Sequence, residues 1–201
     1  MRAIDQTVHR ERGHVLLADT RRLSHTTYQL LAMAQADTVS VAESFGRIDL
    51  RQTVADSVER AFDRALKRDI DLGIVAPRTF IEGSAWLLNE ALANLIDNAL
   101  THTPDGGRIT VRCGMEGSYA FLEVEDDGCG IEPGERDRVR DRFHRGRNAR
   151  GEGSGLGLAI VERAALVHDG SVCIDAGADG RGTRVRISLR TTCRNLVDVM
   201  T

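Results

Sequence analysis

The chain has 201 residues, of which 41% are hydrophobic and 28% charged, and its formal net charge is −3. This composition excludes a disordered or fibrous protein and disfavours general nucleic-acid binding, which usually needs a basic surface. No apolar run approaches the roughly 18–20 residues that span a bilayer, and the charged first residues lack the apolar segment of a signal peptide. We therefore expect a soluble protein with one domain of ordinary size, or one domain plus a short appendage.

Glycine, the cationic residues and cysteine each carry information. Sixteen of the 20 glycines lie between Gly106 and Gly182, and the cations are 26 arginines and one lysine, Lys67. A cationic contact to phosphate would therefore use arginine. None of the four cysteines is spaced as CxxC, so we predict reduced thiols and no zinc site, with Cys113 and Cys173 facing the core.

Residues 14–36 are predicted to form one helix, because Leu16, Leu23 and Leu30 recur every seven residues. A helix packed on its own domain would also fit, but the tight heptad spacing favours a helical bundle or coiled coil. Residues 37–46 are expected to be a linker.

Beyond the linker, helical and extended patterns are mixed. We predict strands at 47–50, 70–75, 108–113, 119–125, 172–174 and 183–189. We predict helices at 52–68, from Ser84 to about Leu100, at 135–143 and at 155–167, the last one ending at Gly170. Because strands and helices do not strictly alternate, this order favours a layer of helices on one mixed sheet over a doubly wound fold.

The helix that begins near Ser84 carries a polar stripe beside its leucines. Glu90, Asn94, Asn98 and His102 are spaced four residues apart, so they follow one face. Asn is a poor residue for a helix interior, and amide and carboxylate oxygens are ligands that Mg²⁺ accepts together with water and phosphate. The stripe is therefore either a solvated helix face or part of a cation site.

Two glycine segments have features of a ligand site. Asp126–Ile131 comes directly after a strand, where a carboxylate on a tight glycine turn can accept a hydrogen bond from a ligand amino group, although the pattern alone also fits a simple turn. Residues 151–158 lead straight into a helix, whose free N–H groups and dipole form an anion site. This second segment is not a GxxxxGK[ST] phosphate loop, because it has no Lys.

Between the glycine segments, residues 136–150 hold seven arginines and two aspartates, a local charge of +5. Such a segment attracts a polyanion such as a triphosphate. It would also fit a solvated, mobile surface loop, and mobility combined with phosphate attraction describes a lid.

Three of these features occur in a characteristic order: the polar stripe, the Asp126–Ile131 turn and the glycine segment at 151–158. In this order they resemble the ATP-binding domain of bacterial two-component sensor histidine kinases. Residues 90–104 resemble the family's N-box, 126–130 its first glycine box, 141–146 its F-box and 153–158 its second glycine box. The resemblance runs from about Ile48 to Leu189. It implies an α/β two-layer sandwich, the Bergerat (GHKL, HATPase) ATP-binding fold, over residues 46–192, followed by a tail at 193–201.

The resemblance also implies roles in a site for ATP and Mg²⁺. Asn98, with Asn94, would hold Mg²⁺ against the phosphates, and Asp126 would accept from the adenine amino group. The candidate catalytic residues are Glu90, Asn94 and Arg145, with Arg145 near the γ-phosphate. The other candidate nucleotide-binding residues are His102, Gly128, Gly130, Ile131, Gly153, Ser154, Gly155, Leu156, Gly157 and Thr183.

Two positions depart from the family pattern. Thr101 and His102 replace a frequent Lys/Arg–Tyr pair, and His102 could stack on the base or touch phosphate. Arg140 stands where the F-box usually has its first Phe, which puts a charge in place of a buried apolar anchor.

Residues 1–45 resemble part of a dimerisation and phosphoacceptor hairpin, with 14–36 as its second helix. The first helix normally bears the phosphorylated His followed by an acidic residue, and none of the six histidines has these neighbours. We therefore expect either a fragment of a longer kinase or a kinase that has lost its acceptor.

The resemblance implies a histidine kinase that binds ATP–Mg²⁺ and passes the γ-phosphoryl group to a His outside this chain, and then to an Asp of a response regulator. It also implies a homodimer through the N-terminal helix and a cytoplasmic location, with the full-length kinase at the inner membrane. The alternatives are a degenerate nucleotide-binding module that acts through protein contacts and an anti-sigma-type serine kinase, which would lack the heptad helix. Related topoisomerase, chaperone and MutL-like ATPases are disfavoured, because Asn94 occupies the place of their water-activating Glu.

Overall fold

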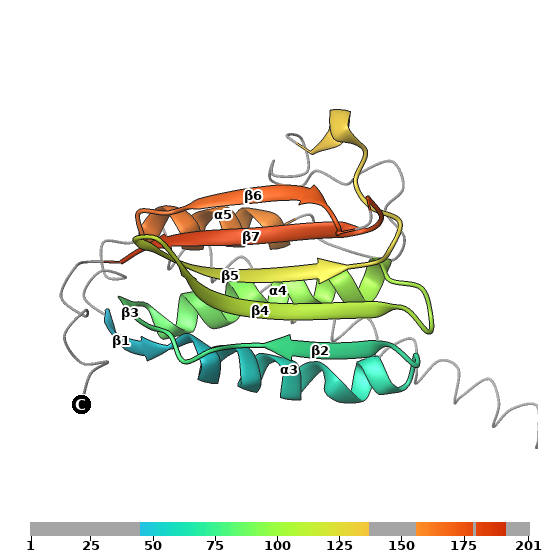
Figure 1. The fold of residues 1–201 in the computed structure, drawn as a ribbon, viewed down its shortest axis with the longest axis horizontal. Coiled ribbons are helices and arrows are strands. Elements are labelled where there is room, and N and C mark those ends of the chain that lie inside the picture. Colours follow the sequence, from blue (N-terminus) through green and yellow to red (C-terminus); the bar gives the residue numbers. More distant parts are fainter. Residues whose placement is uncertain (1–44, 137–155, 179, 192–201) are drawn as a thin grey trace, which may run out of the picture.

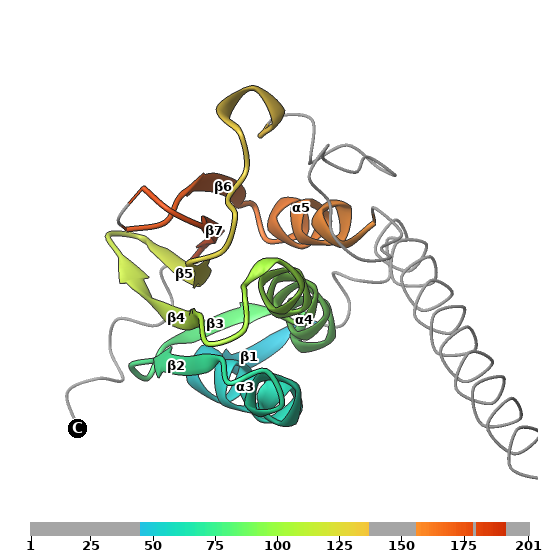
Figure 2. The ribbon, with the colours of Figure 1, turned by 90° about the vertical axis from the view of Figure 1, so that its right-hand side faces the viewer.

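Within residues 45–136, 156–178 and 180–191, the computed structural model describes a five-stranded sheet covered on one face by three α-helices (Figures 1 and 2). The strand order is β2-β4-β5-β7-β6. The strand bounds are Asp71–Val75 for β2, Arg108–Glu116 for β4, Tyr119–Asp126 for β5, Thr183–Arg190 for β7 and Ser171–Ala176 for β6. β2 and β4 are parallel and the other neighbours are antiparallel, which confirms the predicted mixed sheet with helices on one side.

The strands alternate between a face that packs on the helices and an open face. On β5, Leu122 and Val124 are buried beneath the helices. On the open face, the carboxylate of Glu123 is paired with Arg112 of β4 at 3.2 Å and with Arg186 of β7 at 2.7 Å. Glu123 is therefore buried between two cationic side chains.

The three helices supply much of the core. α3 spans Leu50–Leu66, α4 spans Ala85–His102 and α5 spans Gly157–Val167, so the helices predicted at 52–68, 84–100 and 155–167 are confirmed to within two residues. The Asp49 carboxylate accepts from the Arg51 N–H at the start of α3, and the Ser84 hydroxyl accepts from the Leu87 N–H at the start of α4. Such caps satisfy N–H groups that have no partner within a helix.

The end of α5 differs from the expected glycine cap. The residue in the left-handed region is Asp169, with a φ of 50°, and the Gly170 N–H donates to the Ala165 carbonyl at 2.8 Å. Only glycine fits at position 170, because a Cβ there would lie 1.9 Å from the carbonyl oxygen of Ser188.

A short second sheet has two strands, of which only one was predicted. β1, Gly46–Asp49, is the strand expected at 47–50, and it pairs antiparallel with β3, Phe80–Gly83. With only four residues, β3 is too short for a clear alternation. The guanidinium of Arg47 lies 4.4 Å from the ring centroid of Phe80, a cation–π contact between the two strands.

Several predictions fall partly or wholly outside the described residues. These include the helix at 14–36, nearly all of the linker, and most of the helix at 135–143, at whose start there is a 3-10 turn over Pro133–Glu135. Cys113 is buried as predicted, but the prediction for Cys173 is wrong. Cys173 is exposed, because Val172 and Ile174 take the buried face of β6. No helix in the described ranges is both long and apolar enough to cross a membrane.

Candidate functional site

Asp126 lies at the end of β5, beside the start of β7. Its Oδ1 atom accepts hydrogen bonds from the N–H groups of Gly128 at 2.9 Å and Thr183 at 3.3 Å. No hydrogen bond to Oδ2 comes from the described part of the chain. The structure therefore brings together three predicted site residues and leaves one carboxylate oxygen for a ligand donor.

Burial raises the pKa of the Asp126 carboxyl to about 6. The hydrogen bonds from Gly128 and Thr183 act against this rise, and the neighbouring carboxylates of Asp127 and Glu125 add to it. At neutral pH the group is ionised but poorly solvated, so a hydrogen bond from a ligand N–H would stabilise it.

Three glycines allow the chain to close around Asp126. A Cβ at Gly128 would lie 2.5 Å from the carbonyl oxygen of His102, and a Cβ at Gly182 would lie 1.8 Å from that of Asp126. Gly130 and Gly182 have φ values of +72° and +67°, which favour glycine. Gly182 was not among the predicted site residues, although its place in Gly180–Thr183 is a turn signal.

Ile131 follows these glycines and is partly buried. Its side chain packs against the main hydrophobic core. Among the predicted ligand residues, Ile131 therefore also has a clear packing role at the edge of the site.

His102, the last residue of α4, lies next to the first glycine box through its carbonyl group. Its Nδ1 atom is buried and has no hydrogen-bond partner. Burial also lowers the pKa of His102, because desolvation disfavours the charged ring. A neutral ring with an unsatisfied nitrogen is consistent with its predicted place beside a ligand.

The polar stripe on α4 is divided between two environments. Asn94 is 4% exposed and its Nδ2 donates to the Glu90 carbonyl at 2.8 Å, whereas Asn98 is exposed and Glu90 is half-buried. Asn94 faces the start of α5, since a Cβ at Gly157 would lie 3.0 Å from its Oδ1. Of the two alternatives for the stripe, a solvated helix face therefore does not hold for Asn94.

The start of α5 lacks a side-chain cap. Leu156 precedes the helix and provides no side-chain cap, so the first turn from Gly157 offers N–H groups with no partner within the helix. Such a start suits an anion. The Leu156 side chain is buried against Ala159 and Ile160, so a contact from Leu156 to a ligand would come from its main chain.

Five residues that matter to the prediction lie outside the described residues. They are Arg140, Arg145, Gly153, Ser154 and Gly155. Asp127 was not predicted to have a role in the site. Its Oδ1 accepts from the Arg108 N–H at 2.8 Å and thereby holds the first glycine box to β4.

The donor set limits which cation could bind. No group of three or more His, Cys, Asp and Glu side chains suited to a metal occurs in the described ranges. Asn94 and Asn98 contribute neutral amide oxygens, so Mg²⁺ here would need phosphate and water to complete its shell.

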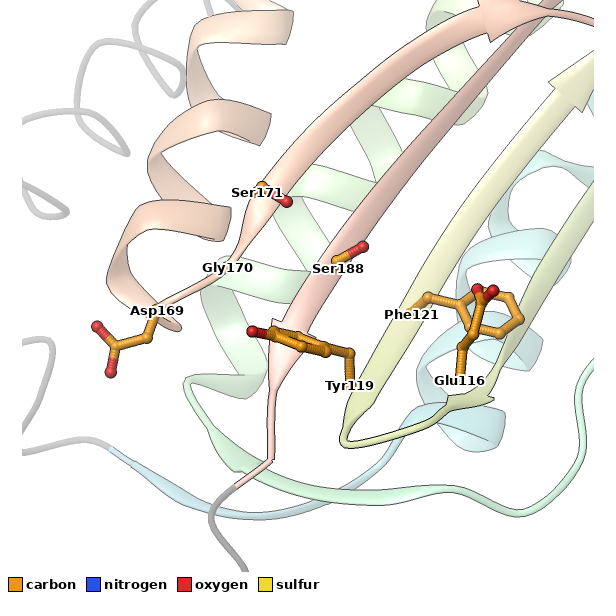
Figure 3. Close-up of a pocket in the computed structure, with 7 residues that line it drawn as sticks. All are labelled: Glu116, Tyr119, Phe121, Asp169, Gly170, Ser171 and Ser188. Atoms are coloured by element: carbon orange, nitrogen blue, oxygen red, sulfur yellow. The ribbon is translucent and has the colours of Figure 1, made fainter.

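A pocket of about 400 Å³ lies at the opposite end of the sheet (Figure 3). Glu116, Tyr119 and Ser188 line it, together with Asp169 just beyond α5. Tyr119 begins β5 and Asp126 ends it, so this pocket is separate from the candidate site.

Comparison with known proteins identifies the family. Residues 83–192 match the family described as histidine kinase-, DNA gyrase B- and HSP90-like ATPase. The chain belongs to this family. The match covers α4, both glycine segments and the last strands, which are the elements that form the candidate site.

Relatives within this family are named as sensor kinases. Sensor protein kinase PmrB of Pseudomonas aeruginosa is 33% identical over 172 residues, which are 85% of this chain. Sensor histidine kinase CusS of Escherichia coli is 36% identical over 180 residues, or 86% of this chain. The chain spans 36% of the length of each of these relatives.

Solved structures agree with this assignment. The mycobacterial sensor histidine kinase MprB matches with a TM-score of 0.65 and 34% identity over 73% of this chain and 97% of that chain. The Acinetobacter baumannii histidine kinase AdeS, at 20% identity, matches with a TM-score of 0.70 over 88% of this chain and 82% of that chain, which shows the fold. The predicted fold class and the resemblance to sensor histidine kinases are confirmed.

Proposed function

We propose that this chain is the ATP-binding catalytic part of a two-component sensor histidine kinase. In this role it binds ATP with Mg²⁺, and the γ-phosphoryl group is transferred to a His that lies outside this chain. A response-regulator Asp then receives the phosphoryl group from that His. The identity to sensor kinases over 85% of the chain supports this proposal.

The observation that carries the proposal is the environment of Asp126. One carboxylate oxygen is held by the N–H groups of Gly128 and Thr183, and the other is left for a donor. An adenine ring presents an amino group that can donate to this oxygen. The adjacent glycines let the base approach the main chain closely.

The other residues have roles that follow from their positions. The uncapped start of α5 at Gly157 would donate N–H groups to the phosphates. The amide oxygens of Asn94 and Asn98 would hold Mg²⁺, which neutralises charge on the phosphates. Arg145 would reach the γ-phosphate, and His102 would contact the nucleotide beside the first glycine box.

Calorimetric titration of the full chain with ATP and Mg²⁺ tests binding. The Asn98→Ala variant is expected to bind at least about tenfold more weakly, because it removes a metal ligand. Asn89→Ala is a matched control on the same helix, since the Asn89 side chain bonds to the Ala85 carbonyl within α4. Absence of binding at millimolar ATP, or unchanged binding by Asn98→Ala, would contradict the proposed site.

Phosphoryl transfer requires a second test, because binding alone also fits a degenerate regulatory module. A separately supplied phosphoacceptor hairpin, mixed with the chain and labelled ATP, should gain label on its His while ADP is released. Binding without any label on a competent hairpin would favour the regulatory module.

The remaining features of the whole protein are part of the same proposal. We expect homodimer formation through residues 1–45, a response-regulator receiver domain as partner, and a cytosolic position for this part of the kinase. Sedimentation of the full chain over a range of concentrations tests the dimer.

A further inference from the structure

The ring of His168 is enclosed where several elements meet. His168 follows directly after α5 and is 5% exposed. One face of its ring stacks on Phe45, with the ring centroids 5.0 Å apart and an angle of 16° between the planes. The ring also abuts Gly83 at the end of β3, where a Cβ would lie 2.5 Å from Nε2.

Two main-chain contacts determine the protonation of this ring. Nδ1 lies 2.7 Å from the Ala164 carbonyl oxygen, and the Ser84 N–H points to Nε2 at 3.0 Å. A carbonyl can only accept and an amide N–H can only donate, so Nδ1 carries the hydrogen and Nε2 is bare. The ring is therefore neutral, which agrees with a pKa that burial lowers below its ordinary value.

These contacts join the ends of the two helices that flank the candidate nucleotide site. Ser84 is the cap residue of α4, and the His168 ring holds it to the end of α5. At the other end of α5, Gly157 lies so close to Asn94 that an added Cβ would be 3.0 Å from its Oδ1. Both ends of α5 therefore contact α4 closely. If His168 moved, α5 could not easily adjust to the movement, and the shift would reach Gly157 and Asn94.

Phe45 connects the same ring to the chain that leads into the domain. It directly precedes β1, and the register of β1 places Gly46 opposite Gly83. The His168 ring thus contacts both Phe45, just before β1, and Ser84, at the start of α4.

We propose that His168 is a positioning residue, which as a neutral imidazole holds the start of α5 and Asn94 in their nucleotide-binding arrangement and relays the position of Phe45 to them. This inference rests on the proposed function for its link to ATP. Its structural claim can be tested without nucleotide.

Protonation would break the contact on which this arrangement depends. A proton on Nε2 would face the Ser84 N–H, and two donors cannot bond to each other. The surrounding segments carry charged residues of both signs. They are Asp169 next in the chain, Glu162 and Arg163 on α5, Glu82 on β3, Arg47 and Asp49 on β1, and Arg184, Arg186 and Arg190 on β7. Of these, Asp169 raises the pKa of His168 electrostatically, but desolvation is the larger effect.

Two substitutions at His168 separate its hydrogen bonds from its titration. His168→Leu removes both main-chain contacts of the ring, whereas His168→Gln keeps a planar amide that can accept from the Ser84 N–H and donate to the Ala164 carbonyl but binds no proton. Phe45→Leu removes the stacked ring, and Phe62→Leu is its control, because Phe62 is an exposed aromatic residue on α3. Leu166→Ala is the control for α5, because Leu166 is exposed on that helix.

Hydrogen exchange of the nucleotide-free full chain at pH 7.5 tests positioning directly. His168→Leu and Phe45→Leu are expected to speed exchange of the hydrogen-bonded amides of α5, beginning with the Ile160 N–H that donates to the Leu156 carbonyl, by at least about tenfold. His168→Gln, Phe62→Leu and Leu166→Ala are expected to leave this exchange near the wild-type rate. Unchanged exchange in both His168→Leu and Phe45→Leu overturns the proposal. If His168→Leu does not fold, Phe45→Leu alone decides between these outcomes.

The affinity for ATP–Mg²⁺ tests the link to the site. The ratio of the dissociation constants of wild type and His168→Gln is expected to be near one at pH 7.5 and to rise severalfold once the pH is low enough to protonate His168, which an NMR titration of its ring detects. Asp126 is present in both proteins, so its own titration cancels in this ratio. A ratio that stays flat after His168 has protonated overturns the proposed role of the neutral ring, whereas absence of binding by the wild type contradicts the proposed function and leaves the exchange test to judge His168.

Discussion

Gly182 packs directly against the carbonyl group of Asp126, so that an ideally placed Cβ at Gly182 would be 1.8 Å from that oxygen. Its φ of +67° also lies in the region that favours glycine. The turn before β7 therefore has no room for a side chain at the point where it supports the Asp126 carboxylate.

Gly182→Ala is expected to lower the free energy of unfolding by about 2–4 kcal/mol, because left-handed strain and a main-chain collision add together. Urea denaturation measures this change. Gly180→Ala is the matched control, since Gly180 has a φ of +71° with nothing within 4 Å of its Cβ position. It should lose only about 1–2 kcal/mol, and equal losses in the two variants would show that the collision is relieved.

Asp126→Asn is expected to stabilise the nucleotide-free protein at pH 7.5 by about 1–3 kcal/mol, the order implied by a shift of this size. The pKa of Asp126 is raised from 3.8 to about 6 in the folded protein. The contribution of Asp126 to the free energy of unfolding is therefore most favourable below pH 3.8, and it is lost as the pH rises through about 6. The amide oxygen of Asn can still accept from Gly128 and Thr183.

Urea denaturation at pH 7.5 and pH 4 checks this sign. The gain from Asp126→Asn should be present at pH 7.5 and should shrink toward zero at pH 4. Asp127→Asn, at an exposed neighbour, should give no comparable gain. A loss of stability in Asp126→Asn at pH 7.5 would show that the ionised carboxylate is stabilising.

The affinity for ATP is expected to fall as the pH decreases through about 6, the pKa of Asp126 in the free protein. The protonated carboxyl is a poorer acceptor for the adenine amino group than the carboxylate. Asp126→Asn should bind ATP at least about tenfold more weakly at pH 7.5, since a charge-assisted hydrogen bond contributes about 1.5–3 kcal/mol. Calorimetry from pH 5 to pH 8 measures both effects, and a pH-independent affinity in the wild type would contradict this role.

The main elements of this fold could be predicted because each had a strong local pattern. The leucines of α4 recur at helical spacing, and Asp126 follows an alternating strand and precedes two glycines. β3 had no such signal, because a strand of four residues is too short to show a clear alternation of apolar and polar side chains. Its pairing with β1 depends on contacts more than 30 residues apart in the chain, which local patterns do not reveal.

The environments of single residues were harder to predict. Four-residue spacing advances around a helix by roughly 40° at each step. Asn94 therefore faces α5, while Asn98 is exposed. The role of His168 depends on Phe45, Gly83 and Ser84, which lie at least 84 residues away in the chain, so its environment has no local sequence signal.

Gly157→Ala is expected to weaken ATP binding while the domain stays folded. Alanine is favoured over glycine inside a helix by about 1 kcal/mol, which offsets part of the cost of crowding. The new methyl group would, however, lie 3.0 Å from Oδ1 of Asn94, the atom proposed to face Mg²⁺. We expect a severalfold loss of affinity for ATP with Mg²⁺ and a smaller loss without Mg²⁺, both measured by calorimetry. Gly134→Ala, at a glycine with nothing within 4 Å, should bind as the wild type does. If Gly157→Ala lost affinity equally with and without Mg²⁺, the methyl group would be acting on the phosphates and not through Asn94.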